Sequence, residues 1–448
     1  MTTFLGIIIA IFILGLLIVS HEFGHFLMAK ICGIGVIEFS LGMGPRICSW
    51  GKGETRYSLK AIPFGGSCLM VGEDPAGGGE IDVDVFDKEE ADIIEPENSF
   101  SKKSVWARIL VVIGGPLFNF LLAFLLGVIL VAVSGSNDPI VYKVESGYGA
   151  ESAGLQNGDL ITEINGHSIS LGQDIELYNK VYPLDGDATV SFIRDGKEQI
   201  VSYDSSFSVY RVGINYLGDD ESARLYSITE GTPAYESGLR NDDVVTSING
   251  TEIKTGADMA NYFRENPASD MPITFTVTRV GGELTTTITP KLVTGHTLGF
   301  SASYYRSDPT FLSAIKGGFK EMMYGIRAVF LSVKMLVSGT VSVSEVSGPV
   351  GVVAVISDTV KESSQDGALY VLINMMMLTI LLSANLGVVN LLPFPALDGG
   401  RFIILLVEAI FKKKLPRNIE LKINMAGFMI LMAFMVVVLF NDVFKLFR

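Results

Sequence analysis

The sequence predicts a polytopic α-helical membrane protein with a water-soluble α/β region in its middle. Four apolar runs are each long enough to cross a bilayer, which takes about 20 residues in a helix. The chain of 448 residues is 48% apolar with a mean hydropathy of +0.41, too apolar for a soluble protein, yet 18% of its residues are charged. Residues 153–166 recur in similar form as residues 237–250, which implies two copies of one soluble domain.

The first predicted span, residues 1–31, contains a pair of histidines at the end of its apolar run Phe4–Ser20. His21 and His25 are four residues apart, so on a helix both imidazoles can reach one metal ion. Glu22 stands beside them, where it can take a proton from water. Ionisable residues near the membrane core cost roughly 2.5–3.5 kcal/mol and are presumed functional. The motif predicts zinc hydrolysis, and the alternative is a histidine pair that only packs or caps.

The amino terminus lacks a basic region and a small-residue cleavage site, so we expect the first span to be retained. Residues 32–72 follow it and are expected to form a re-entrant β element. Within them, Arg56–Lys60 and Ser67–Met70 flank Pro63, Gly65 and Gly66 as the arms of a short hairpin would. Residues 73–104 begin with glycines and acidic residues and are predicted to be a mobile acidic loop, most simply a solvated insertion.

The other predicted spans are residues 105–134, 370–400 and 422–441. Lysine and arginine cluster between the first two spans and again between the last two. By the positive-inside rule both connections are cytoplasmic, so the termini and the central region lie outside. The histidine motif then lies toward the cytoplasmic side of the bilayer.

Charge and cysteine content exclude other classes of protein. The net charge is −14 and the pI is near 4.9, so no basic stripe is available for phosphates and nucleic-acid binding is not expected. Cys32, Cys48 and Cys68 match neither a zinc knuckle nor a redox pair, and we expect them to be reduced and structural.

The two central copies are predicted over residues 139–208 and 209–293. In each, a short helix ending at glycine precedes a strand and an Asn-Gly turn, and a helix and a strand pair come later. This order resembles the PDZ domain in its bacterial, circularly permuted form. Such domains bind an extended chain end by adding it to a sheet edge.

Residues 309–366 are predicted to form an amphipathic exterior helix and a linker. Basic residues recur at intervals of four and seven along an apolar helix, which is typical of a helix lying on the membrane surface rather than of a fifth span. Ser347, Gly348 and Pro349 are expected to break this helix before the third span.

A catalytic zinc ion takes three protein ligands and keeps one position open, so the two histidines need a third ligand. His167 and His296 lie in the exterior region. Asp398 follows a proline-broken helix at the end of the third span and is the candidate. Its alternative role is that of a carboxylate in a turn with Gly399 and Gly400.

These motifs, in this order, resemble the site-2 protease family of intramembrane zinc metalloproteases, in the bacterial form of the regulator of sigma-E protease. The resemblance covers essentially the whole chain. It rests on the histidine motif, Gly42-Met43-Gly44, Ile62-Pro63-Phe64-Gly65-Gly66, Gly114-Gly115-Pro116-Leu117-Phe118-Asn119, the repeats, Ser347-Gly348-Pro349 and the segment Asn390 to Gly400.

The resemblance implies one Zn²⁺ per chain, held by His21, His25 and Asp398, with Glu22 as the catalytic acid/base. It also implies that the β element pairs with unwound substrate, although Ser67-Cys68-Leu69 departs from the family's commoner pattern. The implied substrate-binding residues are Asn385, Asn390, Pro393, Pro395, Gly42, Gly44, Gly65 and Gly66.

An amide can hold a peptide backbone without placing another charge in the membrane, which suits Asn390 or Asn385. The alternative is hydrogen bonding between helices, worth about 0.6 kcal/mol on average. Asn119, in the second span, is better explained in that way.

We therefore expect an intramembrane endopeptidase of the bacterial inner (plasma) membrane, with the PDZ pair as a substrate filter. The resemblance suggests single-pass substrates such as anti-sigma factors or signal-peptide remnants, trimmed outside by an upstream site-1-type protease. A noncatalytic receptor or scaffold with structural zinc is an alternative, but such a site has no use for Glu22. A transporter would call for inverted repeats among the spans, and the sequence contains none.

Overall fold

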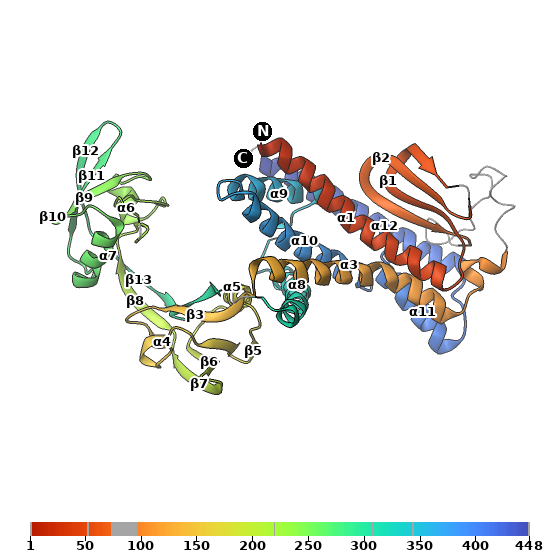
Figure 1. Ribbon diagram of the computed structural model, residues 1–448, viewed down its shortest axis with the longest axis horizontal. Coiled ribbons are helices and arrows are strands. Elements are labelled where there is room, and N and C mark those ends of the chain that lie inside the picture. Colours follow the sequence, from red (N-terminus) through yellow and green to blue (C-terminus); the bar gives the residue numbers. More distant parts are fainter. Residues whose placement is uncertain are drawn as a thin grey trace. The chain divides into compact units, whose positions relative to one another are not determined.

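The computed structural model describes residues 2–51, 53–72, 96–218, 220–305, 309–342 and 345–446. They form two compact units (Figure 1). The helical unit comprises residues 1–139, 170–181 and 304–448, and the repeat unit comprises residues 140–169 and 182–303. Most of the predicted acidic loop, residues 73–95, lies outside the described residues.

Within the described part of the chain, four helices are long and apolar enough to cross a membrane, as predicted. They are α1 (Thr2–Ile31), α3 (Val105–Ser134), α10 (Ala368–Leu391) and α12 (Arg417–Leu446). Helices α1 and α3 approach closely because Gly24 and Gly114 face each other, and a side chain on either would overlap the other's backbone. Small residues at such crossings are usual between membrane helices, where packing rather than hydrophobicity drives association.

The predicted third span, residues 370–400, is divided into two helices. Helix α10 ends at Leu391, and Asp398 begins a separate helix, α11 (Asp398–Phe411). The backbones of Gly399 and Gly400 lie against the carbonyls of Leu392 and Phe394, where a Cβ would overlap them. These glycines therefore fold the first turn of α11 back onto the end of α10.

The β element lies beside α1 and consists of β1 (Val36–Trp50) and β2 (Arg56–Met70) (Figure 1). Phe39 pairs with Tyr57 on one side and with Cys68 on the other, so residues 38–41 lie between residues 56–59 and 66–69. The hairpin predicted between Arg56–Lys60 and Ser67–Met70 is therefore wrong. Both strands bend sharply enough to pair twice, which the sequence pattern of each short segment does not reveal.

Helix α8 (Phe311–Val337) packs against α3 and α10. Two of its basic residues have acidic partners: Lys320 Nζ lies 2.8 Å from Asp138, and Arg327 lies 2.9 Å from both carboxylate oxygens of Asp174. Asp174 belongs to α5 (Gly172–Val181). The periodic basic residues, predicted to face a membrane surface, thus also connect α8 to neighbouring segments of the helical unit.

The segment predicted as a linker contains a further helix, α9 (Pro349–Ser363). Pro349 begins this helix rather than only ending the preceding one, as suits proline's missing N–H in a first turn. The amides of Gly348 and Gly351 donate hydrogen bonds of 3.1 and 2.8 Å to the carboxylate of Asp442 on α12. The glycine-rich turn therefore joins α9 to the last helix.

The repeat unit contains matching elements from each sequence copy. A strand-helix-strand order repeats, with a long hairpin at the end of each copy. The first copy has α4 (Gly149–Ser152), β4 (Leu160–Ile164), β5 (His167–Ser168), β6 (Asp187–Arg194) and β7 (Lys197–Asp204). The second has α6 (Pro233–Glu236), β9 (Val244–Ile248), β10 (Thr251–Glu252), α7 (Gly256–Glu265), β11 (Ile273–Arg279) and β12 (Gly282–Ile288). The counterpart of α7 in the first copy is α5, which belongs to the helical unit.

The second copy is inserted into the first rather than following it. Strand β8 (Ser206–Arg211) enters it, and β13 (Lys291–His296), paired antiparallel with β8, leaves it. The chain then returns as β14 (Phe300–Tyr305), beside β3 (Asp138–Val144) in the sheet of the first copy. The predicted division at residues 208 and 209 misses this return because it follows only the repeated segments.

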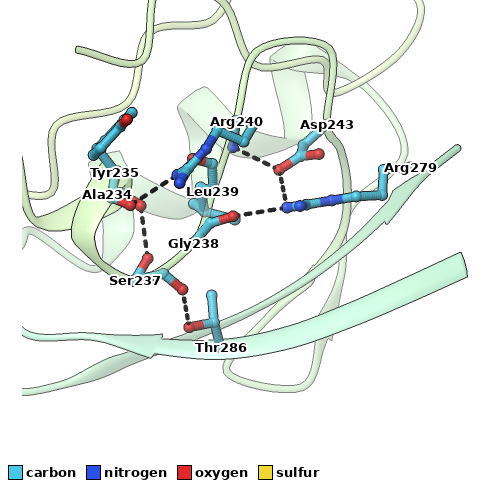
Figure 2. Close-up of polar contacts among 9 residues, drawn as sticks. All are labelled: Ala234, Tyr235, Ser237, Gly238, Leu239, Arg240, Asp243, Arg279 and Thr286. Carbon is cyan, nitrogen blue, oxygen red and sulfur yellow. Dashed lines mark hydrogen bonds and ion pairs between the residues drawn. The ribbon is translucent and has the colours of Figure 1, made fainter. Parts of the chain in front are cut away.

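A buried aspartate has the same partners in both copies. Figure 2 shows the second, where Arg279 donates to Asp243 at 2.7 Å and to the carbonyl of Gly238 at 2.9 Å. The amide of Arg240 also donates to Asp243, at 2.8 Å. Arg194 and Asp159 form the equivalent pair in the first copy. Both aspartates are 1% exposed, so each copy is held by a buried carboxylate that pairs with an arginine and accepts a hydrogen bond from a backbone amide.

Candidate metal centre and active site

Three side chains that could hold a metal ion converge between α1 and α11. His21 Nε2 and His25 Nε2 lie 3.2 Å apart, and they lie 3.2 and 3.4 Å from Asp398 Oδ2. The histidine side chains are 12% exposed and the aspartate is 17% exposed. The structure thus brings the three residues predicted as ligands to one point, although nearly the whole chain separates them.

The state of Asp398 fits a metal ligand. Its Oδ2 is buried and, despite the short distances to both imidazoles, has no partner in hydrogen-bond geometry among the described residues. A buried carboxylate oxygen without a partner is costly unless a cation compensates it. Two imidazole nitrogens and one carboxylate are also a common ligand set of catalytic zinc. The residues present therefore suit zinc.

The carbonyl of Val111 on α3 orients the imidazole ring of His25. It lies 2.8 Å from His25 Nδ1, which must carry a proton to donate to it. Nε2 of the same ring then keeps its lone pair for a metal. No side-chain pattern reveals this contact, because the acceptor is a backbone carbonyl.

Asn119 on α3 is placed to orient the other ring. Its side-chain amide lies 3.2 Å from His21 Nδ1, and its Oδ1 has no hydrogen-bond partner among the described residues. If the amide is rotated by half a turn, Oδ1 accepts a proton from Nδ1 and leaves His21 Nε2 free for a metal. The sequence prediction of a bond between helices was right in kind, but it did not place Asn119 against the histidines. Its position as a buried amide in an apolar span was the available signal.

Gly115 provides the space for the two rings. A Cβ at this position would overlap both His21 and His25. Any side chain here would push α3 away from α1 or displace the imidazoles. The Gly114-Gly115 pair therefore determines both how closely the helices pack and where the rings lie.

Glu22 is held by the outer segment of β2, residues 66–69. The backbone amide of Cys68 hydrogen-bonds to the Glu22 carboxylate, and a Cβ on Gly66 would lie 2.9 Å from Glu22 Cγ. Of the four glycines predicted to bind substrate, Gly66 is thus the one that lies against Glu22. Gly42, Gly44 and Gly65 lie where the strands bend, with φ of 86°, 85° and 86°.

The asparagines and prolines predicted to bind substrate lie near Asp398 in sequence but form no hydrogen bond to the cluster in the described structure. Asn385 is exposed and Asn390 is half-buried on α10. Pro393 is exposed in the turn before α11, and Pro395 packs against Gly427 of α12. None of the four has a hydrogen bond to His21, Glu22, His25 or Asp398.

Comparison with known proteins identifies the family. Residues 9–434 match the model of peptidase family M50. The zinc metalloprotease RasP of Geobacillus kaustophilus is 30% identical over 99% of this chain and 98% of its own. The regulator of sigma-W protease RasP of Bacillus subtilis is 29% identical over 99% of this chain and 100% of its own.

Among solved structures, the PDZ domain of HtrA3 bound to a phage-derived ligand matches 20% of this chain and 92% of its own, at 17% identity. The TM-score of 0.17 is too low to establish a shared fold. The family match and the relatives cover almost the entire chain, including both halves of the histidine and aspartate cluster. The chain therefore belongs to peptidase family M50, the site-2 protease family, and is a zinc metalloprotease of the membrane.

Proposed function

We propose that this protein cleaves membrane-spanning segments of other proteins at the cluster formed by α1 and α11. The convergence of two imidazole nitrogens on the unpartnered Oδ2 of Asp398 carries the proposal. His21, His25 and Asp398 are the ligands of one zinc ion, and Glu22 is the acid/base. A helix long and apolar enough to span a membrane carries three of these four residues.

Bound zinc supplies Lewis acidity, which polarises a peptide carbonyl and makes water more acidic. Glu22 accepts the proton that the attacking water loses and returns it to the leaving amine. The Cys68 amide fixes the carboxylate while it does so. Val111 and Asn119 hold the imidazoles so that their Nε2 atoms face the reaction.

The substrate helix must unwind before water can reach a peptide carbonyl. We propose that it pairs with the outer segment of β2, residues 66–69, because that segment is bonded to residues 38–41 on one side and also touches Glu22. Strand addition of this kind satisfies the backbone groups that unwinding exposes. Asn390, and less directly Asn385, could then hold the peptide from α10.

The test of the proposal is Glu22→Gln in the purified full chain. This change removes the base but keeps the shape of the side chain, so cleavage of a reporter membrane segment should fall about 10²- to 10⁴-fold. Zinc content should stay unchanged, because Glu22 is not a ligand. Glu54→Gln, at an exposed carboxylate paired with Lys30, is the matched control and should cleave normally. Normal cleavage by the Glu22 variant would exclude the assigned role.

The name of the sigma-W relative leads us to propose anti-sigma factors, or signal-peptide remnants, as substrates. The central repeats then act as a filter that admits single-pass proteins already trimmed by an upstream site-1-type protease. In this proposal the repeats face the exterior of a bacterial inner membrane, and the cluster lies toward the cytoplasm. The lysine and arginine residues concentrated in the two connections between spans support that orientation.

Strand register allows a precise test of the filter. Arg211 and Lys291 are paired neighbours, so residues 212–290 can be replaced by an Asn-Gly turn that closes β8 onto β13. The shortened protein should cleave untrimmed substrate faster, by tenfold or so, while trimmed substrate is cleaved within about twofold of normal. An equal loss for both substrates would argue against a filter.

A further inference from the structure

A basic cavity lies where the two lysine-rich connections between spans come together in the helical unit. One connection precedes α3 and the other follows α11. The cavity has a volume of about 560 Å³, within the range of small-ligand pockets. Three elements line it: the 3₁₀ helix η3 (Phe100–Lys102), the first turns of α3, and the last turn of α11 with the residues after it. None of the residues that line the cavity belongs to the histidine and aspartate cluster.

The charges of this cavity are strongly unbalanced. Lys102, Lys103, Lys412 and Lys414 line it, while Glu408, the one carboxylate among its described lining residues, already pairs with Arg108. One Arg108 nitrogen donates to Glu408 at 3.0 Å, and the other contacts the second carboxylate oxygen. Among the described residues, Lys102 and Lys412 have no carboxylate within ion-pair distance. These four lysines come from the two basic connections between spans, and they gather on one cavity although the net charge of the chain is −14.

The surroundings of the cavity are apolar and exposed. Ile403, Val407, Ile410 and Phe411 are all exposed on α11. Their spacing places them on one face of the helix, which ends at the cavity. Trp106, next to the cavity residue Val105, is also exposed, and tryptophan is enriched where membrane meets water. A soluble anion has no use for this apolar face, but acyl chains would cover it.

The geometry points to a binding site for the phosphate headgroup of an anionic phospholipid, with the acyl chains lying along α11. The lysines neutralise the phosphate. The first backbone amides of α3, which follow its N-cap Ser104, lie at the end of the helix that lines the cavity, where the helix dipole also favours an anion. The cavity also spans the joint between α3 and α11 at Arg108 and Glu408. These two helices carry Val111 and Asp398, so a bound lipid would hold together the scaffold of the cluster.

The first test measures binding to the full chain in detergent. Short-chain phosphatidylglycerol, phosphatidylcholine and inorganic phosphate are titrated separately, and bound lipid is counted by native mass spectrometry. Phosphatidylglycerol should bind saturably and raise the Tm, since a ligand that binds only the folded state stabilises it. Phosphatidylcholine and inorganic phosphate should do so at least tenfold more weakly.

Matched variants locate the site. Lys102→Gln combined with Lys412→Gln removes two charges from the cavity, and affinity for phosphatidylglycerol should fall on the order of 10- to 30-fold, or about fivefold per lysine. The control is Lys413→Gln combined with Lys422→Gln, because both lysines are exposed and neither lines the cavity. It should bind within about twofold of normal. The Tm without lipid shows whether each variant is folded.

Three outcomes would overturn the inference. Equal weakening in both double variants would mean that surface charge alone attracts the lipid. Equal protection by inorganic phosphate would assign the cavity to a free anion. Lipid binding that occurs only after deletion of the acidic residues 76–94 would mean that the chain's own carboxylates occupy the cavity instead.

Discussion

Buried aspartates have opposite surroundings in the two units. In the repeat unit, Asp159 and Asp243 are 1% exposed, and each is bonded to an arginine and to a backbone amide. In the helical unit, Asp398 has a buried oxygen that lacks any hydrogen-bond partner in the described structure. The first arrangement satisfies the carboxylate within the fold, and the second leaves it available to a cation.

This difference assigns the two kinds of aspartate to different roles: the paired ones stabilise the fold, and the unpaired one serves the chemistry of the site. A carboxylate with complete hydrogen bonds contributes to the folded state, and breaking its set costs several kcal/mol. A carboxylate left incomplete in a buried site destabilises the protein by itself and is retained for function. If this reasoning is correct, substitutions in the two units should affect different measurements.

The largest expected effect is that of Asp398→Asn on metal binding. Asparagine is a poor zinc ligand, so zinc content should fall from about one ion per chain to a small fraction, and cleavage should fall at least about 10³-fold. Zinc is measured by elemental analysis after dialysis. Asp366→Asn, at an exposed aspartate in the turn before α10, should change neither quantity. Normal zinc affinity in the Asp398 variant would remove this residue from the site.

Asp243→Asn should have the opposite profile. It leaves Arg279 without its carboxylate, and the local unfolding free energy of the second copy should fall by about 3 kcal/mol. Hydrogen exchange followed by mass spectrometry, applied to residues 223–288 of the full chain, measures this. Zinc content should not change. A loss of zinc here would contradict the separation of the two kinds of aspartate.

Asn119→Leu tests whether Asn119 affects zinc binding by orienting the ring of His21. Without an acceptor for its Nδ1–H, His21 should bind zinc about 10- to 100-fold more weakly. Asn119→Asp keeps an acceptor oxygen and should restore most of the affinity, which a merely packing role would not. Competition with a chelator gives the affinities. Equal affinities in both variants would show that Asn119 does not orient the ring.

Asp174 has backbone partners like the repeat aspartates but also pairs with a helix of the helical unit. Loss of this ion pair should have the smallest effect of the substitutions considered. Asp174 accepts hydrogen bonds from the amides of Ser170 and Leu171, as a repeat aspartate would, and also pairs with Arg327 on α8. Asp258 takes the equivalent amides in the second copy but has no arginine partner in the described structure.

Because Arg327 is about one-third exposed, Arg327→Gln should cost only about 1 kcal/mol in the protection of α5. A double-mutant cycle with Asp174→Asn measures the pair directly. A coupling energy near zero would mean that the pair contributes nothing to holding α5 on α8.

The sequence by itself determined the membrane class, the four spans and the repeat, because hydropathy, length and self-similarity are local properties. It also determined that His21 and His25 share a helix face. The spacing of four residues fixes that geometry wherever the helix lies.

Only the tertiary structure decided what surrounds those histidines. The acceptor for His25 is the carbonyl of Val111, the neighbour of Glu22 is the amide of Cys68, and both are backbone groups that every sequence offers. The double pairing of β1, the division of the third span before Asp398 and the insertion of one repeat into the other depend equally on contacts between distant segments. Such contacts are selected by packing and by backbone hydrogen bonding, which residue patterns constrain only weakly.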